Sequence, residues 1–108
     1  MNEGFDRREE GFETQFRLEG EQRFRAAARR NKLLARWAAG LLGITGDDVD
    51  AYVMDVIKAD FEETGDDDVF RKVRLDFDAK SVEVTDEELR AKMNSFMQEA
   101  THEVIDGE

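Results

Sequence analysis

The sequence predicts an all-α protein, an up-and-down four-helix bundle with a flexible N-terminal segment. The 108-residue chain contains no proline, and 40% of its residues are charged while 40% are hydrophobic. This composition is typical of amphipathic helices. Apolar residues recur at intervals of three and four along four segments, which is the period of a helix with one buried face. The segments are joined by short connections, which make consecutive helices run antiparallel.

The first two helices are expected over residues 20–42 and 46–62. Gly43 is a typical end signal for the first helix, and Thr45 is the expected N-cap of the second. In the first helix the apolar or small face comprises Phe24, Ala27, Ala28, Asn31, Leu34, Ala35, Ala38, Leu41 and Leu42. In the second it comprises Val49, Tyr52, Val53, Val56 and Ile57, with Phe61 as a marginal member.

The third and fourth helices are expected over residues 66–80 and 85–104. Asp66 is the expected N-cap of the third helix. The fourth begins with the capping-box pattern that runs from Thr85 to Glu88, in which each residue's side chain bonds the other's backbone N–H. The buried stripes are Val69, Phe70, Val73 and Phe77 in the third helix, and Leu89, Met93, Phe96, Met97, Ala100 and Val104 in the fourth.

Residues 1–19 are expected to form a mobile segment that precedes the bundle domain of residues 20–108. Phe5, Phe12 and Phe16 share one helical face, but glycines interrupt the segment and make it a poor helix on its own. A mobile segment with three aromatic anchors has the form of a peptide that folds into a partner's groove. The alternative is that the three rings extend the core of the first helix.

Few residues in the chain could carry catalytic chemistry. There is no cysteine, which excludes disulfides, thiolate nucleophiles and sulfur-based metal sites. The single histidine, His102, falls in the last turn of the fourth helix, with no nucleophile at a usable spacing. The acidic residues around Asp66 lack the ligand pattern of a calcium loop, and there is no phosphate-binding loop. We therefore expect no enzymatic activity, no metal and no cofactor.

Charge is distributed unevenly along the chain. The formal net charge of −11 divides into +2 for residues 1–42 and −13 for residues 43–108, and no acidic residue lies between Gln22 and Leu42. A basic stripe of this kind is compatible with nucleic-acid binding. However, the acidic remainder of the domain would repel phosphate, and the chain has no nucleic-acid motif. We expect instead that the basic helix packs beside acidic helices of the same chain.

Four strings of residues are more specific than these patterns. They are ARRNKLL (Ala28 to Leu34), WAAGLLGITG (Trp37 to Gly46), VIKADFEETGDDDVFRKV (Val56 to Val73) and FDRREEGFETQFRLEGEQRFR (Phe5 to Arg25). Together they closely resemble the zeta subunit family, small inhibitor proteins of the alphaproteobacterial F-type ATP synthase. The likeness covers nearly the whole chain and weakens after about Val84.

The resemblance implies a function and a partner. It implies a four-helix bundle whose N-terminal segment, Asn2 to Glu19, enters the interface between alternating subunits of the catalytic head and stalls rotation in the ATP-hydrolysing direction. The expected partner-binding residues are Phe5, Arg7, Arg8, Phe12, Phe16 and Arg17. We expect the phenylalanines to dominate, because burying rings contributes more affinity than charges at the rim of an interface.

The alternative function is a nucleotide-sensing or adaptor bundle that docks on a protein assembly without inhibiting it. Weak nucleotide binding through the arginines stays open, although no motif supports it. No apolar run approaches the ~20 residues of a membrane span, and the N-terminus has no signal-peptide pattern. We therefore expect a cytoplasmic monomer that neither inserts into membranes nor binds nucleic acid.

Overall fold

The computed structural model describes residues 19–62 and 65–107. Four helices contain most of them: α2 (Gly20–Leu42), α3 (Asp47–Ala59), α4 (Asp67–Ala79) and α5 (Asp86–Asp106). Within these residues there is no strand, so the predicted all-α class is confirmed. The predicted helix ends lie within three residues of the observed ones. None of the four helices combines the length and the apolar character needed to cross a membrane.

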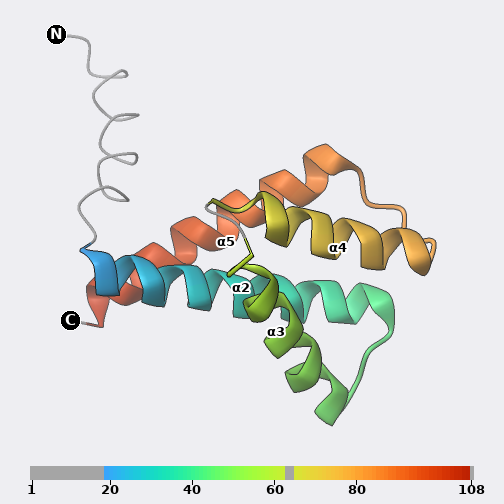
Figure 1. Cartoon of the computed structure of the whole chain (residues 1–108), viewed down its shortest axis with the longest axis horizontal. Helices are drawn as coiled ribbons and strands as arrows, with labels where there is room; N and C mark the ends of the chain where they lie inside the picture. Colours follow the sequence, from blue (N-terminus) through green and yellow to red (C-terminus); the bar gives the residue numbers. More distant parts are fainter. Residues whose placement is uncertain (1–18, 63–64, 108) are drawn as a thin grey trace, which may run out of the picture.

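α2 is the central helix of the bundle, because it contacts each of the other three. α5 packs along α2 and runs in the opposite direction (Figure 1). α3 returns from the far end of α2 at an incline to it, and α4 reverses direction again before the chain turns into α5 (Figure 1). The result is a bundle in which the first turns of α2 and the last turns of α5 lie at the same end.

Local sequence determines where the helices begin. At α5, Thr85 Oγ1 accepts from the Glu88 backbone N–H at 3.1 Å, and Glu88 Oε1 accepts from the Thr85 N–H at 3.2 Å, so the predicted capping box is confirmed. At α3, the prediction of Thr45 as N-cap is wrong. The N-cap is Gly46, whose backbone has φ 61° and ψ −139°, a conformation that residues with a side chain rarely adopt. Asp66 is the N-cap of α4, as predicted, but its side chain makes no capping hydrogen bond.

The hydrophobic core is formed where the four helices meet. The largest fully buried apolar side chains are Phe77, Leu34, Leu89, Met93, Val56, Val69 and Val73, all of which lie on the predicted apolar faces. Trp37 packs edge-on against Phe77, with ring centroids 5.6 Å apart, and its ring lies 6.4 Å from that of Phe96. These contacts join α2, α4 and α5, and they make Trp37 a packing residue.

Three residues that were expected on buried faces are exposed. Phe24 and Phe61 are 59% and 66% exposed, and Leu41 is exposed as well. Phe24 lies near the start of α2, Phe61 just beyond the end of α3 and Leu41 near the end of α2. Helical periodicity identifies the face of a helix that is buried, but it does not show how far the neighbouring helices extend along that face.

Candidate functional site

The residues predicted to bind the partner, Phe5, Arg7, Arg8, Phe12, Phe16 and Arg17, lie outside the described residues. The structure does describe the point at which their segment joins the bundle. There the backbone N–H of Glu19, the N-cap of α2, donates to Gln22 Oε1 at 2.9 Å. This bond satisfies a backbone donor that would otherwise lack a partner at the helix start. α2 therefore has its own start signal at Glu19.

An ion pair fixes the end of α5 against this part of α2. Arg29 Nε donates to Glu103 Oε2 at 2.6 Å. The hydrogen bond, with the attraction between the two charges, lowers the pKa of Glu103 and raises that of Arg29. Both side chains are 40% exposed, so the pair orients α5 more than it stabilises the fold.

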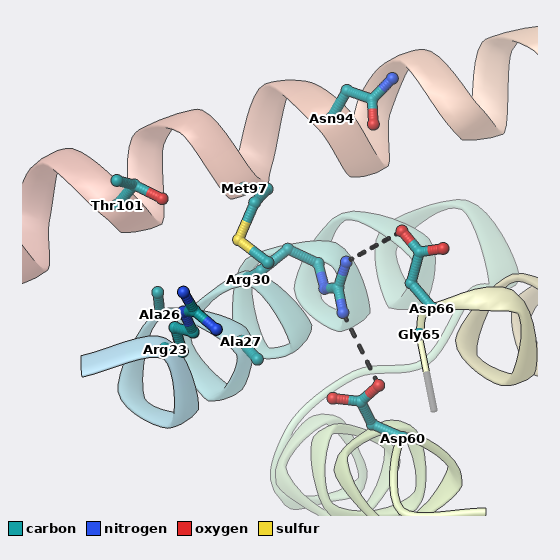
Figure 2. A pocket seen from close by; sticks show the side chains of 10 residues that line it. All are labelled: Arg23, Ala26, Ala27, Arg30, Asp60, Gly65, Asp66, Asn94, Met97 and Thr101. Atoms are coloured by element: carbon teal, nitrogen blue, oxygen red, sulfur yellow. Dashed lines mark ion pairs between the residues drawn. The ribbon is translucent and has the colours of Figure 1, made fainter. Parts of the chain in front are cut away.

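The side chain of Arg30, the residue after Arg29, is buried between α2, the end of α3 and the start of α4. Only 3% of Arg30 is exposed. Its guanidinium nitrogens lie 3.8 Å from Asp60 Oδ1 and 3.7 Å from Asp66 Oδ2 (Figure 2). Burial lowers the pKa of Arg30, and the nearby carboxylates act in the opposite direction. Arg30 is therefore a buried cation held by two acidic side chains from other parts of the chain.

Asn31 completes this polar cluster of Arg30, Asn31, Asp60 and Asp66. Its Oδ1 accepts from Arg30 Nε at 2.7 Å, and its Nδ2 donates to Asp60 Oδ2 at 2.9 Å. Asn31 is itself buried, so these two bonds satisfy a side chain that would be costly to bury without partners. The cluster fastens the end of α3 to the middle of α2.

Beside the cluster lies an open cleft of about 660 Å³ between α2 and α5 (Figure 2). It is lined by Arg23, Ala26, Ala27, Arg30, Asp60, Gly65, Asp66, Asn94, Met97 and Thr101. Thr101 Oγ1 is a buried oxygen that has no hydrogen-bond partner among the described residues. Because two carboxylates already face Arg30, this arginine does not present an uncompensated positive charge to a phosphate in the cleft.

The basic stripe of α2 is partly matched by acidic groups of the same chain. Arg29 pairs with α5, and Arg30 pairs with the end of α3 and the N-cap of α4. For these two arginines the prediction of packing beside acidic helices is confirmed. The sequence pattern does not predict the burial of Arg30, although it places the neighbouring Asn31 on the apolar face.

No group of three or more histidine or acidic side chains in the described ranges could hold a metal ion. His102 is exposed near the end of α5, as its predicted place in the last turns implied. Asp66 and Asp67 face Arg90 at 3.1 and 2.7 Å, so two carboxylates of the acidic run are engaged in ion pairs.

Comparison with known proteins agrees with this architecture. The sequence model of a family described as ATPase inhibitor subunit zeta matches residues 1–103. A solution NMR structure is 46% identical in sequence, with a TM-score of 0.68, and the match covers 79% of this chain and 96% of that chain. No curated protein sequence matches. The family match includes both the N-terminal segment and the four helices, and the chain therefore belongs to the ATPase inhibitor subunit zeta family.

Proposed function

We propose that this protein inhibits ATP hydrolysis by an F-type ATP synthase and that residues 2–19 are the inhibitory segment. The segment enters the interface between alternating subunits of the catalytic head and stalls rotation in the hydrolytic direction. The observation that carries this proposal is the family match over residues 1–103, because it includes the segment as well as the bundle. Membership in a family of inhibitor subunits also favours a regulator without catalytic activity of its own.

The architecture supports separate roles for the two parts of the chain: residues 2–19 bind the partner, and residues 20–108 form the stable bundle. The core described above is built from α2, α3, α4 and α5, and α2 has its own start signal at Glu19. Changes within the segment should therefore affect binding without loosening the core. Phe5, Phe12 and Phe16 are the proposed anchors, since burying an aromatic ring contributes about 1.5–3 kcal/mol.

The test is the full chain with Phe5→Ala, Phe12→Ala and Phe16→Ala combined, added to the isolated catalytic head during ATP hydrolysis. We expect the half-inhibitory concentration to rise by orders of magnitude, because three rings contribute on the order of several kcal/mol. The melting temperature, followed by circular dichroism, should stay unchanged. A large fall in melting temperature, with inhibition kept per folded molecule, would show instead that the rings belong to the core.

A matched variant replaces Arg7, Arg8 and Arg17 with glutamine in the same segment. Charges at the rim of an interface mainly change the association rate and its salt dependence. This variant should therefore lose much less inhibition than the phenylalanine variant, and its defect should shrink as salt is added. Equal losses in the two variants would contradict the assignment of the rings as main anchors.

The same assay separates inhibition from the alternative of a docking adaptor. An adaptor would bind the catalytic head without slowing hydrolysis, so binding measured on an immobilised head would be saturable while turnover stayed constant. Repeating the binding measurement with and without ADP tests whether a nucleotide alters the interaction. Inhibition that saturates together with binding supports the proposed function.

A further inference from the structure

Two exposed aromatic rings form an apolar surface near the start of α2. Phe24 and Phe61 are 59% and 66% exposed, and their ring centroids lie 6.0 Å apart. They border a hollow of about 270 Å³. Its lining, the Phe24–Phe61 hollow, comprises Phe24, Ala27, Ala28, Asn31, Ile57, Asp60, Phe61 and Gly65.

The polar cluster holds this hollow in shape. Asp60, which precedes Phe61, accepts a hydrogen bond from Asn31 of α2 at 2.9 Å and faces the buried Arg30. The end of α3 is therefore fixed against α2, and the two rings stay paired although neither is covered. Contiguous apolar patches on the surface of soluble proteins are often interaction sites, and hot spots of binding cluster in well-packed pockets.

The hollow lies close to the start of α2. Phe24 lies five residues after Glu19, which is about 8 Å along the helix axis. If residues 2–19 occupy the catalytic head, as proposed above, the hollow lies just outside the point of insertion and is brought against the same partner. A hollow of about 270 Å³ has room for one large apolar side chain.

A second copy of this chain is a poorer occupant. Each phenylalanine exposes up to ~150 Å² here, since a whole aromatic side chain presents about 150–250 Å². A stable dimer buries about 800 Å² per partner, which is more than twice the area of the two rings together. A contact this small gains affinity only when another contact already tethers the two proteins, since the tether raises the effective concentration.

We infer that the Phe24–Phe61 hollow is a second docking site for the catalytic head. It receives a protruding apolar side chain, a leucine, methionine or aromatic residue, from the surface beside the point where residues 2–19 enter. The hollow anchors the bundle and leaves the stalling of rotation to the segment. This inference rests on the proposed function and assigns the bundle its own share of the binding.

The test is the full chain with Phe24→Ser and Phe61→Ser combined, and Leu75→Ser on α4 is the matched control because Leu75 is 67% exposed. We expect the double variant to raise the half-inhibitory concentration by about tenfold or more, while inhibition at saturation stays complete. The Leu75→Ser control should have the same half-inhibitory concentration as the unchanged protein. Circular dichroism should give the same melting temperature for all three, since each replaced side chain is mostly exposed.

Several outcomes would overturn the inference. One is an unchanged half-inhibitory concentration in the double variant, and another is a lower plateau of inhibition, because the hollow would then act in stalling and not in anchoring. A dimer of the unchanged protein that the double variant loses in sedimentation equilibrium would show that a second copy covers the hollow. An equal defect in the Leu75→Ser control would show a general loss of surface hydrophobicity.

Failure of the proposed function gives a different result. If the unchanged protein binds the catalytic head but does not slow hydrolysis, the proposal that residues 2–19 insert and stall rotation is wrong. In that case the docking site is tested by binding alone. Weaker binding of the double variant supports the hollow as a contact, and unchanged binding overturns it.

Discussion

We expect the carboxylate of Asp60 to contribute more to the stability of the fold than the Arg30 cation that it faces. Arg30 is almost fully buried, whereas Asp60 and Asp66 are partly exposed. Asp60→Ala would leave the cation facing Asp66, 3.7 Å away, and the charge of Asp68, and it would leave the Asn31 side-chain amide without its acceptor. We expect this variant to lose about 3 kcal/mol of unfolding free energy, the lower end for a broken buried ion pair.

Arg30→Met should cost less, about 2 kcal/mol. The two carboxylates keep contact with water, but the buried Asn31 Oδ1 loses the hydrogen bond that Arg30 Nε donates. Urea unfolding followed by the fluorescence of Trp37, the single tryptophan, measures both variants. A larger loss for Arg30→Met than for Asp60→Ala would contradict this asymmetry.

Tyr52 links α3 to α4 through a hydrogen bond that depends on pH. Its hydroxyl donates to Asp76 Oδ2 at 2.8 Å, and burial, together with this bond, raises the pKa of Tyr52 above its ordinary value. The hydrogen bond between Tyr52 and Asp76 stabilises the fold fully at a pH below the pKa of tyrosine in the unfolded chain, which is about 10. This stabilisation is lost as the pH rises through the higher pKa that Tyr52 has in the folded protein.

Because Tyr52 is the single tyrosine, its ionisation can be followed by near-ultraviolet absorbance. In the folded protein, we expect tyrosinate to appear at a higher pH than it does in the urea-unfolded chain. Tyr52→Phe should remove about 1.5 kcal/mol at neutral pH, as for a hydrogen bond to a charged group, and should reduce the loss of stability at alkaline pH. Ionisation at the same pH in the folded and unfolded chains would contradict the buried bond.

At the scale of a helix, the hydroxyl of Thr85 is the critical atom for the start of α5. It accepts the Glu88 N–H, so Thr85→Ala should lower the unfolding free energy by about 1 kcal/mol. Thr85→Ser keeps the hydroxyl and is the matched control, with an expected change of a few tenths of a kcal/mol. Chemical denaturation distinguishes the two, and equal losses would mean that the capping bond contributes nothing.

The helices were predictable because their signals are local. Apolar spacing and the capping box of α5 act within a few residues, so the segments and their buried faces follow from the sequence. The predicted N-cap of α3 is one residue too early. Thr45 is a good capping residue, but the N-cap of α3 has a positive φ, which glycine adopts more readily than a residue with a side chain.

The polar cluster was not predictable in the same way. It joins α2 to residues about thirty positions later in the chain, and this pairing depends on how α3 is inclined to α2. The exposure of Phe24 and Phe61 depends on the same angle. Residues of the inhibitory segment were inferred from amphipathic spacing and family resemblance, and they remain predictions.

Across the protein, the basic first half of the chain forms ion pairs with the acidic second half. The basic first half supplies Arg29 and Arg30, and the acidic second half supplies Glu103, Asp60 and Asp66. Additional salt should weaken the exposed Arg29–Glu103 pair more than the buried cluster. The surface as a whole keeps a strongly negative net charge, which opposes non-specific contact with nucleic acid.

The pairing of Arg29 with Glu103 also brings the end of α5 beside the first turns of α2 (Figure 1). An added label or domain at the C-terminus is therefore placed next to the end from which residues 1–18 emerge. The chain has no cysteine of its own, so a single cysteine introduced at Asp106 could carry a fluorophore whose emission reports when that end is engaged. If residues 2–19 enter the partner as proposed, a bulky C-terminal fusion would crowd that partner, and purification tags are better cleaved before an inhibition assay.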